Sequence, residues 1–437
     1  MKGALRNYAL VTAAYWAFTI TDGALRMLVL LHFNALGYTP VQLAFLFLFY
    51  EFFGIVTNLV GGVLAARMGL KVTMTFGLLL QVFALGALAL LQPGWSVGAS
   101  VAYVMATQAL SGIAKDLTKM SAKSFIKVLI PDDGKGTLFK WVALLTGSKN
   151  ALKGAGFFVG GLLLSLLGFK GALIAMSAAL VLVFLGAQLA LPANMGQTRA
   201  KARFKGMLSK NREVNVLSAA RFFLFGARDV WFVVGVPVFL YDRVGWGFTK
   251  VGAFLALWVI GYGIVQSLAP VLIRRWTGGA TPGARSVPVL AFVLAGVTAG
   301  IALGLAAGVP PVPLIVGGLA VFGVMFALNS AVHSYLILAY SEGDKIAMNV
   351  GFYYMNNAGG RLVGTLLSGL LFQLSGVPGC LWGSVVFAAL AGALSLGSPH
   401  IDHGRLLMRA RALQPQVPQR AREEERHAGV QKGRDRP

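Results

Sequence analysis

The sequence predicts an all-α membrane protein with twelve transmembrane helices arranged as two six-helix halves, and three observations support this fold class. Of the 437 residues, 57% are hydrophobic and only 12% are charged, whereas soluble domains carry about 25% charged residues. The hydrophobic residues gather in runs that are long enough to cross a bilayer, which takes about 20 residues per helix. Parts of the first half of the chain also recur in the second half.

Twelve apolar runs account for most of the chain. The first begins after Lys2 and Arg6 but is interrupted by Asp22 and Arg26 and is followed by no small-residue cleavage site, so we expect a retained helix rather than a signal peptide. The predicted spans are 8–31, 41–66, 72–91, 97–118, 137–168, 171–191, 216–240, 248–272, 287–307, 313–339, 346–374 and 378–397.

The connections between these runs alternate in charge. Short, nearly cation-free connections such as 92–95 and 308–313 alternate with basic ones such as 119–135 and 199–212. The net charge of +23 is therefore better explained by the excess of Lys and Arg in cytoplasmic loops than by nucleic-acid binding. Both termini fall on the basic side, which predicts a multi-pass protein of the plasma (bacterial inner) membrane with both termini in the cytoplasm.

The longest polar break divides the chain into domains. We expect an N-terminal six-helix bundle at 1–192, a cytoplasmic interdomain loop at 193–215 and a C-terminal bundle at 216–397. The tail at 398–437 has no sustained apolar periodicity, so we expect it to be disordered. Cys380 is the single cysteine, which excludes an intrachain disulfide and a cysteine-based metal site. We expect no cofactor and no metal.

One stretch of the first half recurs about 208 residues later with its cation preserved. The shift superposes Lys153 on Arg361 and Gly168 on Gly376, with two further glycine matches between them. Two parallel six-helix repeats are typical of the major facilitator fold. Residues 62–71 also resemble the loop motif G-x-L-A-D-R-x-G-R-K of that superfamily, although Ala66 replaces its acid and Leu70 one of its cations.

Charged residues inside the predicted helices point to an anionic ligand. Five cations stand against three acids at mid-membrane depth, which leaves about two positive charges if every acid neutralises one cation. Arginine suits phosphate-like oxyanions because its planar fork donates parallel hydrogen bonds, and lysine adds a mobile point charge. The candidate substrate-binding residues are Arg26, Lys149, Lys153, Arg228, Asn356, Asn357 and Arg361, and the candidate coupling or ion-pair residues are Asp22, Glu51 and Asp229.

Several of these residues also have structural interpretations. Asp22 and Arg26 are four residues apart and either neutralise each other on one helix or act separately. Glu51 is either a proton carrier or an ion-pair partner. Asn356 and Asn357 either bind oxyanion oxygens or bridge packed helices.

Lysines recur at every fourth residue from the end of the fourth span, beginning with Lys115 and Lys119. They either attract anions to a cytoplasmic mouth or mark topology and contact lipid headgroups; we prefer the second interpretation. Neither a nucleophile–base constellation nor the phosphate loop G-x-x-x-x-G-K-[ST] occurs, so the sequence predicts no enzyme, no catalytic residue and no ATP hydrolysis.

Five long segments carry a more specific resemblance, to the organoarsenical efflux permeases of the major facilitator superfamily. They are TITDGALRMLVLLHF at 19–33, FLFYEFFGIVTNLVGG at 47–62, SGIAKDLTKMSAKS at 111–124, LFKWVALLTGSKNALKG at 138–154 and ARFFLFGARDVWFVVGVPVF at 220–239. The likeness covers about residues 1–397 and excludes the tail.

This resemblance implies a substrate and a functional partner. The family is associated with arsenate resistance alongside glyceraldehyde-3-phosphate dehydrogenase, which makes 1-arseno-3-phosphoglycerate when arsenate replaces phosphate; the permease exports that product. The residues alone predict only an anion. A phosphate or organophosphate exchanger of the same fold is the alternative, and a non-transporting membrane sensor is an alternative of another class. The coupling ion stays open between proton antiport and anion exchange.

Overall fold

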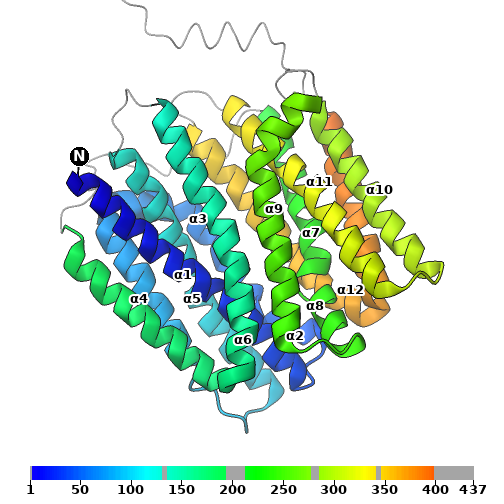
Figure 1. Cartoon of the computed structure of the whole chain (residues 1–437), viewed down its shortest axis with the longest axis horizontal. Helices are drawn as coiled ribbons and strands as arrows, with labels where there is room; N and C mark the ends of the chain where they lie inside the picture. Colours follow the sequence, from blue (N-terminus) through cyan, green and yellow to red (C-terminus); the bar gives the residue numbers. More distant parts are fainter. Residues whose placement is uncertain (1, 130–134, 193–211, 277–284, 341–345, 398–437) are drawn as a thin grey trace, which may run out of the picture. The chain divides into compact units, whose positions relative to one another are not determined.

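The computed structural model describes residues 2–129, 135–192, 212–276, 285–340 and 346–397, and every regular element in these ranges is helical. Figure 1 shows the helices of the first half beside those of the second. In the first half the helices are α1 (Lys2–Ala35), α2 (Pro40–Leu46), α3 (Leu48–Met68), α4 (Leu70–Leu88), α5 (Val97–Leu129) and α6 (Lys135–Ala190). In the second half they are α7 (Arg212–Phe232), α8 (Gly235–Val238), η1 (Phe239–Arg243), α9 (Phe248–Trp276), α10 (Ser286–Ala306), α11 (Pro311–Tyr340) and α12 (Ile346–Leu396).

Ten helical stretches in the described residues are long and apolar enough to cross a membrane. Two of them, within α6 and α12, each change direction at a glycine with a positive φ of 64°, Gly168 and Gly376. Left-handed backbone is accessible to glycine at little cost. Dividing α6 and α12 at these kinks gives the twelve predicted spans, and the kinks fall where the sequence repeat places its matching glycines.

Two predicted spans are broken. The span at 41–66 is divided at Phe47 into α2 and α3, and the span at 216–240 changes after Phe232 into α8 and a π-helical turn. Pro237, which lacks a backbone N–H, lies in the second break. Ser368 Oγ of α12 accepts hydrogen bonds at 3.1 Å from the backbone N–H groups of Val234 and Gly235, so the freed donors of this buried break are satisfied.

Other differences concern the connections. The first residues of α7, from Arg212, occupy the end of the range expected to be a loop, because a helix extends past its apolar segment into charged sequence. The interdomain segment 193–211, the basic connections at 277–284 and 341–345 and the tail at 398–437 lie outside the described residues.

Two long helices carry the contacts between the halves. In the first half, α6 packs against α1 and also against α9 of the second half. In the second half, α12 packs against α7 and also against α2 and α3 of the first half (Figure 1). The repeated stretch therefore occupies equivalent positions in both halves. Its cations, Lys153 and Arg361, both lie between the halves.

Candidate functional site

A cavity of about 230 Å³ lies between the halves. Its walls come from α1, α3, α5 and α6 on one side and from α7, α9, α11 and α12 on the other. The lining includes eight cationic side chains and four carboxylates, an excess of four positive charges, where the sequence predicted about two. These cations are Arg26, Lys115, Lys119, Lys149, Lys153, Arg221, Arg228 and Arg361, and the acids are Asp22, Glu51, Asp116 and Asp229.

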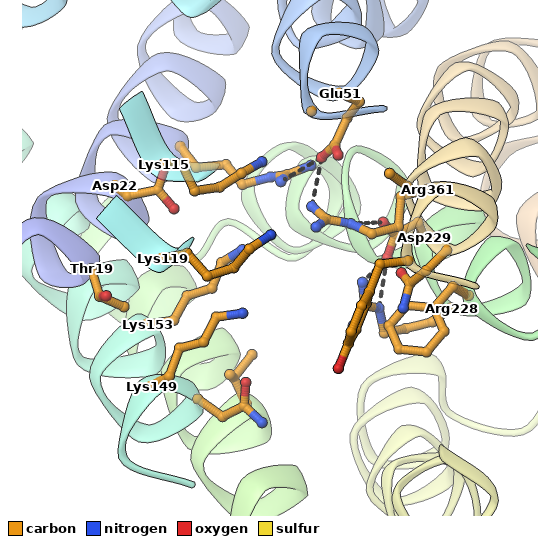
Figure 2. A pocket seen from close by; sticks show the side chains of 18 of the residues that line it. Thr19, Asp22, Glu51, Lys115, Lys119, Lys149, Lys153, Arg228, Asp229 and Arg361 are labelled. Atoms are coloured by element: carbon orange, nitrogen blue, oxygen red, sulfur yellow. Dashed lines mark hydrogen bonds and ion pairs between the residues drawn. The ribbon is translucent and has the colours of Figure 1, made fainter. Parts of the chain in front are cut away.

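Arg361 of α12 joins the two halves electrostatically. Its Nη2 lies 2.6 Å from Glu51 Oε1 of α3, and its Nε lies 3.3 Å from Asp229 Oδ2 of α7. Glu51 also accepts a hydrogen bond from Arg26 at 3.1 Å, and Asp229 pairs with Arg228 at 2.5 Å. Figure 2 shows the part of this alternating chain of charges that runs from Glu51 through Arg361 and Asp229 to Arg228. With three arginines and two carboxylates, it carries one net positive charge.

Asp22 has a different environment from Glu51 and Asp229. The hydroxyl of Tyr50 donates a hydrogen bond of 2.7 Å to its carboxylate, and the ion pair with Arg26 that the i, i+4 spacing allowed is absent from the described contacts. Arg26 is turned instead toward Glu51, with its guanidinium carbon 5.1 Å from the centre of the Phe47 ring. The carboxylate that pairs with Arg26 is therefore Glu51 of α3 and not Asp22 of its own helix.

Lys149 and Lys153 extend from α6 into the cavity, across from Arg361 and Arg228 (Figure 2). Among the described residues, Lys153 forms no ion pair, and its Nζ lies 5.8 Å from the centre of the Phe157 ring. The Lys153 ammonium is therefore a cation of the cavity that no carboxylate of the described residues neutralises directly. Its counterpart in the repeat, Arg361, forms ion pairs with two carboxylates. The two repeat-related cations therefore differ in their partners.

A separate cluster on α5 forms another part of the lining. Lys119 pairs with Asp116 and donates to Asn58 Oδ1 at 2.8 Å, and Thr57 donates to Asp116 at 3.0 Å. Lys115 Nζ lies 3.9 Å from the centre of the Tyr50 ring. Both lysines thus line the cavity, whereas the side chains of the later lysines of this series lie outside the described residues.

The side chains of the two adjacent asparagines of α12 point in different directions. Asn357 lines the cavity. Asn356 donates its side-chain amide to Phe352 O at 3.0 Å, one turn back in its own helix, and is not among the lining residues. Successive helix residues point about 100° apart, so only one of the pair faces the cavity.

Arg221 of α7 is a lining residue that the sequence analysis missed. It is 4% exposed and donates through Nη1 to Ser330 O at 3.2 Å and to Ser330 Oγ at 3.0 Å. Its spacing of seven residues from Arg228, almost two full helical turns, places both on one face of α7 and was the available signal.

Comparisons with known proteins agree with this architecture. The Major Facilitator Superfamily profile matches residues 10–301. No curated protein matches the sequence. Among solved structures, a bacterial homologue of the iron transporter ferroportin in its inward-facing state is 15% identical, with a TM-score of 0.68 over 90% of this chain and 98% of its own. A nucleoside transporter is 14% identical, with a TM-score of 0.67 over 91% and 98% of the two chains.

A D-xylose–proton symporter is similar to the same degree, at 12% identity and a TM-score of 0.68 over 90% of this chain and 97% of its own. At such identities the likeness shows a shared fold and says nothing of a shared substrate. The profile match covers more than half of the sequence, and ten helical stretches of the described residues are long and apolar enough to cross a membrane. This chain therefore belongs to the major facilitator superfamily and is a membrane transporter rather than an enzyme.

Proposed function

We propose that this protein exports a small doubly anionic organoarsenical, 1-arseno-3-phosphoglycerate, by alternating access and thereby confers arsenate resistance. The observation that carries the anionic substrate is the excess of four positive charges in the cavity lining. A buried cation is costly unless a partner or a polar cavity compensates it. The arsenic specificity rests on the resemblance of the five quoted segments to organoarsenical efflux permeases.

The arsenate and phosphate groups bind where cations converge. Lys149 and Lys153 reach the substrate from α6, Arg26 from α1, and Arg228 and Arg361 from α7 and α12 on the other side of the cavity. Arg361 has the central role, because an oxyanion that binds its guanidinium competes with Glu51 and Asp229 of the opposite halves. Binding energy is thereby coupled to the contact between the halves, as alternating access requires.

The remaining assignments complete the proposal. The side at which α1 begins faces the cytoplasm of the cell, and the protein lies in the plasma (bacterial inner) membrane, where glyceraldehyde-3-phosphate dehydrogenase supplies the substrate. Residues 1–192 and 216–397 are the two halves that rock about the site. Coupling involves Asp22, Glu51 or Asp229, of which Asp22 alone is bonded to a tyrosine hydroxyl rather than an arginine.

A phosphate-ester exchanger of the same fold is the second candidate. The favouring observation is the same set of arginines and lysines, because tetrahedral phosphate and arsenate offer them the same kind of acceptor oxygens. The two candidates differ in whether the arseno-ester or an ordinary ester is carried.

Arsenic retention in arsenate-challenged cells that lack other arsenic exporters tests the proposal. Four strains carry this protein, the dehydrogenase, both or neither. Retention is expected to fall only when both are present, because arsenate must first become an ester. If this protein lowers retention alone in cells with negligible host dehydrogenase activity, the ester is not the substrate.

A variant and an exchange assay in proteoliposomes refine this test. Lys153→Ala at normal membrane abundance is expected to abolish the fall in retention; full transport by this variant would remove Lys153 from the site. If arsenic retention does not respond in any strain while 3-phosphoglycerate is exchanged in proteoliposomes, the phosphate-ester exchanger replaces the arsenic exporter.

A further inference from the structure

The proposed site leaves one buried cation without a role. Arg221 lines the cavity, is 4% exposed and has no carboxylate partner among the described residues. Its guanidinium carbon lies 4.0 Å from the centre of the Phe225 ring and 5.0 Å from that of Tyr353. Aromatic faces offset part of the desolvation of a cation but do not satisfy its N–H donors.

The Arg221 side chain has hydrogen-bonding capacity to spare. Nη1 donates to Ser330, but Nε is buried and has no partner among the described groups. A buried guanidinium with an unused donor costs free energy unless a ligand accepts from it. Nε itself is enclosed by the protein, so an oxyanion in the cavity that Arg221 borders accepts from the cavity-facing end of the guanidinium.

A polar relay connects Arg221 with the opposite half. Ser330 Oγ accepts from Gln266 Nε2 at 3.3 Å, and Gln266 Oε1 accepts from Asn150 Nδ2 at 3.1 Å. Asn150 is adjacent in sequence to Lys149 on α6, and Asn150 and Gln266 both line the cavity. The four polar residues thus form a hydrogen-bonded band with side chains of both halves, in which Arg221, Gln266 and Asn150 line the cavity and Ser330 lies buried behind them.

This band lies at a different level from the arginine network. Arg221 precedes Arg228 by seven residues on α7, a rise of about 10 Å toward the end at which that helix begins. Lys149 likewise precedes Lys153 on α6, which starts at the same side of the membrane as α7 because an even number of predicted spans separates their beginnings. The cavity therefore has two cationic levels.

We propose that Arg221 forms a second subsite, nearer the end of the cavity at which α7 begins, for the second oxyanion of a two-ended anionic substrate, while Arg361 and Lys153 hold the first. This rests on the proposed function and deepens it, since it assigns the selection of two-ended over single-ended anions to Arg221. A substrate with one oxyanion occupies one level and leaves the other solvated. A substrate with an oxyanion at each end contacts both levels and gains charge-assisted hydrogen bonds at each.

Binding to the purified full-length protein in lipid nanodiscs tests the subsite, with inorganic phosphate and propane-1,3-diol bisphosphate as probes and isothermal titration calorimetry as the readout. The wild type is expected to bind the bisphosphate about tenfold or more tightly than phosphate. Arg221→Gln is expected to remove most of this advantage, while its affinity for phosphate stays within about twofold of the wild type, because a charge-assisted hydrogen bond contributes roughly a factor of ten or more.

Two further variants separate charge from packing. Arg221→Lys keeps the cation and is expected to retain part of the preference. Ser330→Ala removes a hydroxyl that Arg221 and Gln266 share but keeps the charge, and it is expected to preserve the preference. Thermal melting of each variant reports whether the fold survives, and Arg221→Lys carries the test if Arg221→Gln does not fold.

The outcomes distinguish this inference from the proposed function. If the wild type prefers the bisphosphate and both Arg221 variants keep the full preference, the second subsite is wrong, but the proposal of an anion transporter is unaffected. If Arg221→Gln weakens both probes equally, Arg221 supports the fold or the general potential of the cavity, and the subsite is again wrong. If the wild type binds neither probe, the anion-binding function itself fails.

Discussion

At the scale of single residues, the central fact is that Arg361 is shared between two carboxylates from different halves. Glu51 and Asp229 are each 1% exposed in their side chains, and each also contacts a second arginine. Removing one member of a buried ion-pair network leaves an uncompensated charge, which costs about 3–5 kcal/mol. Because Glu51 keeps Arg26 and Asp229 keeps Arg228, removal of Arg361 weakens the pairing of both acids without leaving either one unpaired.

Arg361→Gln is expected to lower the thermal stability of the purified protein, because Glu51 and Asp229 both lose a partner. The double variant Glu51→Gln, Arg361→Gln is expected to lose less than the sum of the two single losses, since the attraction between Glu51 and Arg361 is then lost only once. Thermal melts of the wild type, both single variants and the double variant complete the cycle. Strictly additive losses would mean that the pair contributes no coupling.

At the scale of the helices, glycines set how closely the long helices approach. Gly360 of α12 faces the backbone of α7, where a Cβ would lie 2.0 Å from Phe222 O. In the first half, a Cβ on Gly156 of α6 would lie 2.4 Å from Ile20 O of α1. Small residues at such crossings allow the close backbone packing that stabilises helix pairs in membranes. The same device is used in both halves.

Gly360→Ala is therefore expected to force α7 and α12 apart and to destabilise the protein by about 1–3 kcal/mol or more, as overpacking does. Gly351→Ala in the same helix is the matched control, because a Cβ there meets no atom within 4 Å. Thermal melting and the yield of monodisperse protein measure the effect. Equal stability of the two variants would show that α12 does not pack on α7 at Gly360.

At the scale of the whole transporter, the halves are joined at the side of the bundle where α1 ends. Asn34 Nδ2 donates to Asp242 Oδ1 at 2.8 Å, and Val41 N donates to Gln373 Oε1 at 3.3 Å. A Cβ on Gly369 would lie 2.3 Å from Pro40 O, so α12 and α2 are also in close contact there. Alternating access requires these contacts to separate when the cavity opens to that side.

Cross-linking across this contact is expected to stop transport. The single native cysteine, Cys380, is buried and is replaced by serine to give a cysteine-free background. Asn34→Cys and Asp242→Cys are then joined by a short bis-methanethiosulfonate reagent, which forms a reducible disulfide with each cysteine and releases methanesulfinate. Substrate flux in proteoliposomes is expected to fall about tenfold or more and to return on reduction, because the halves can no longer separate.

Each single-cysteine variant treated with the same reagent is the control, and its flux is expected to stay close to that of the untreated protein. Undiminished flux through the fully cross-linked double variant would show that this contact does not open during transport.

The sequence alone determined the properties that depend on local composition. Hydrophobic runs and their lengths predicted twelve helices because burial in lipid is a requirement on each segment by itself. The repeat aligned Gly168 with Gly376, and the structure places a positive φ at both, a backbone conformation that favours glycine wherever the segment lies. The intramembrane charges likewise predicted a polar cavity, because lipid excludes them.

Only the tertiary structure decided which charges meet. Asp22 bonds to Tyr50 rather than Arg26, and Arg361, without an acid near it in sequence, lies between Glu51 and Asp229. Pairing depends on the depth and rotation of helices that are hundreds of residues apart, and a shift of one residue turns a side chain by about 100°. For the same reason, only the fold showed that Arg221 lies in the cavity wall near Ser330 of α11 and Gln266 of α9, although its spacing from Arg228 already placed both arginines on one face of α7.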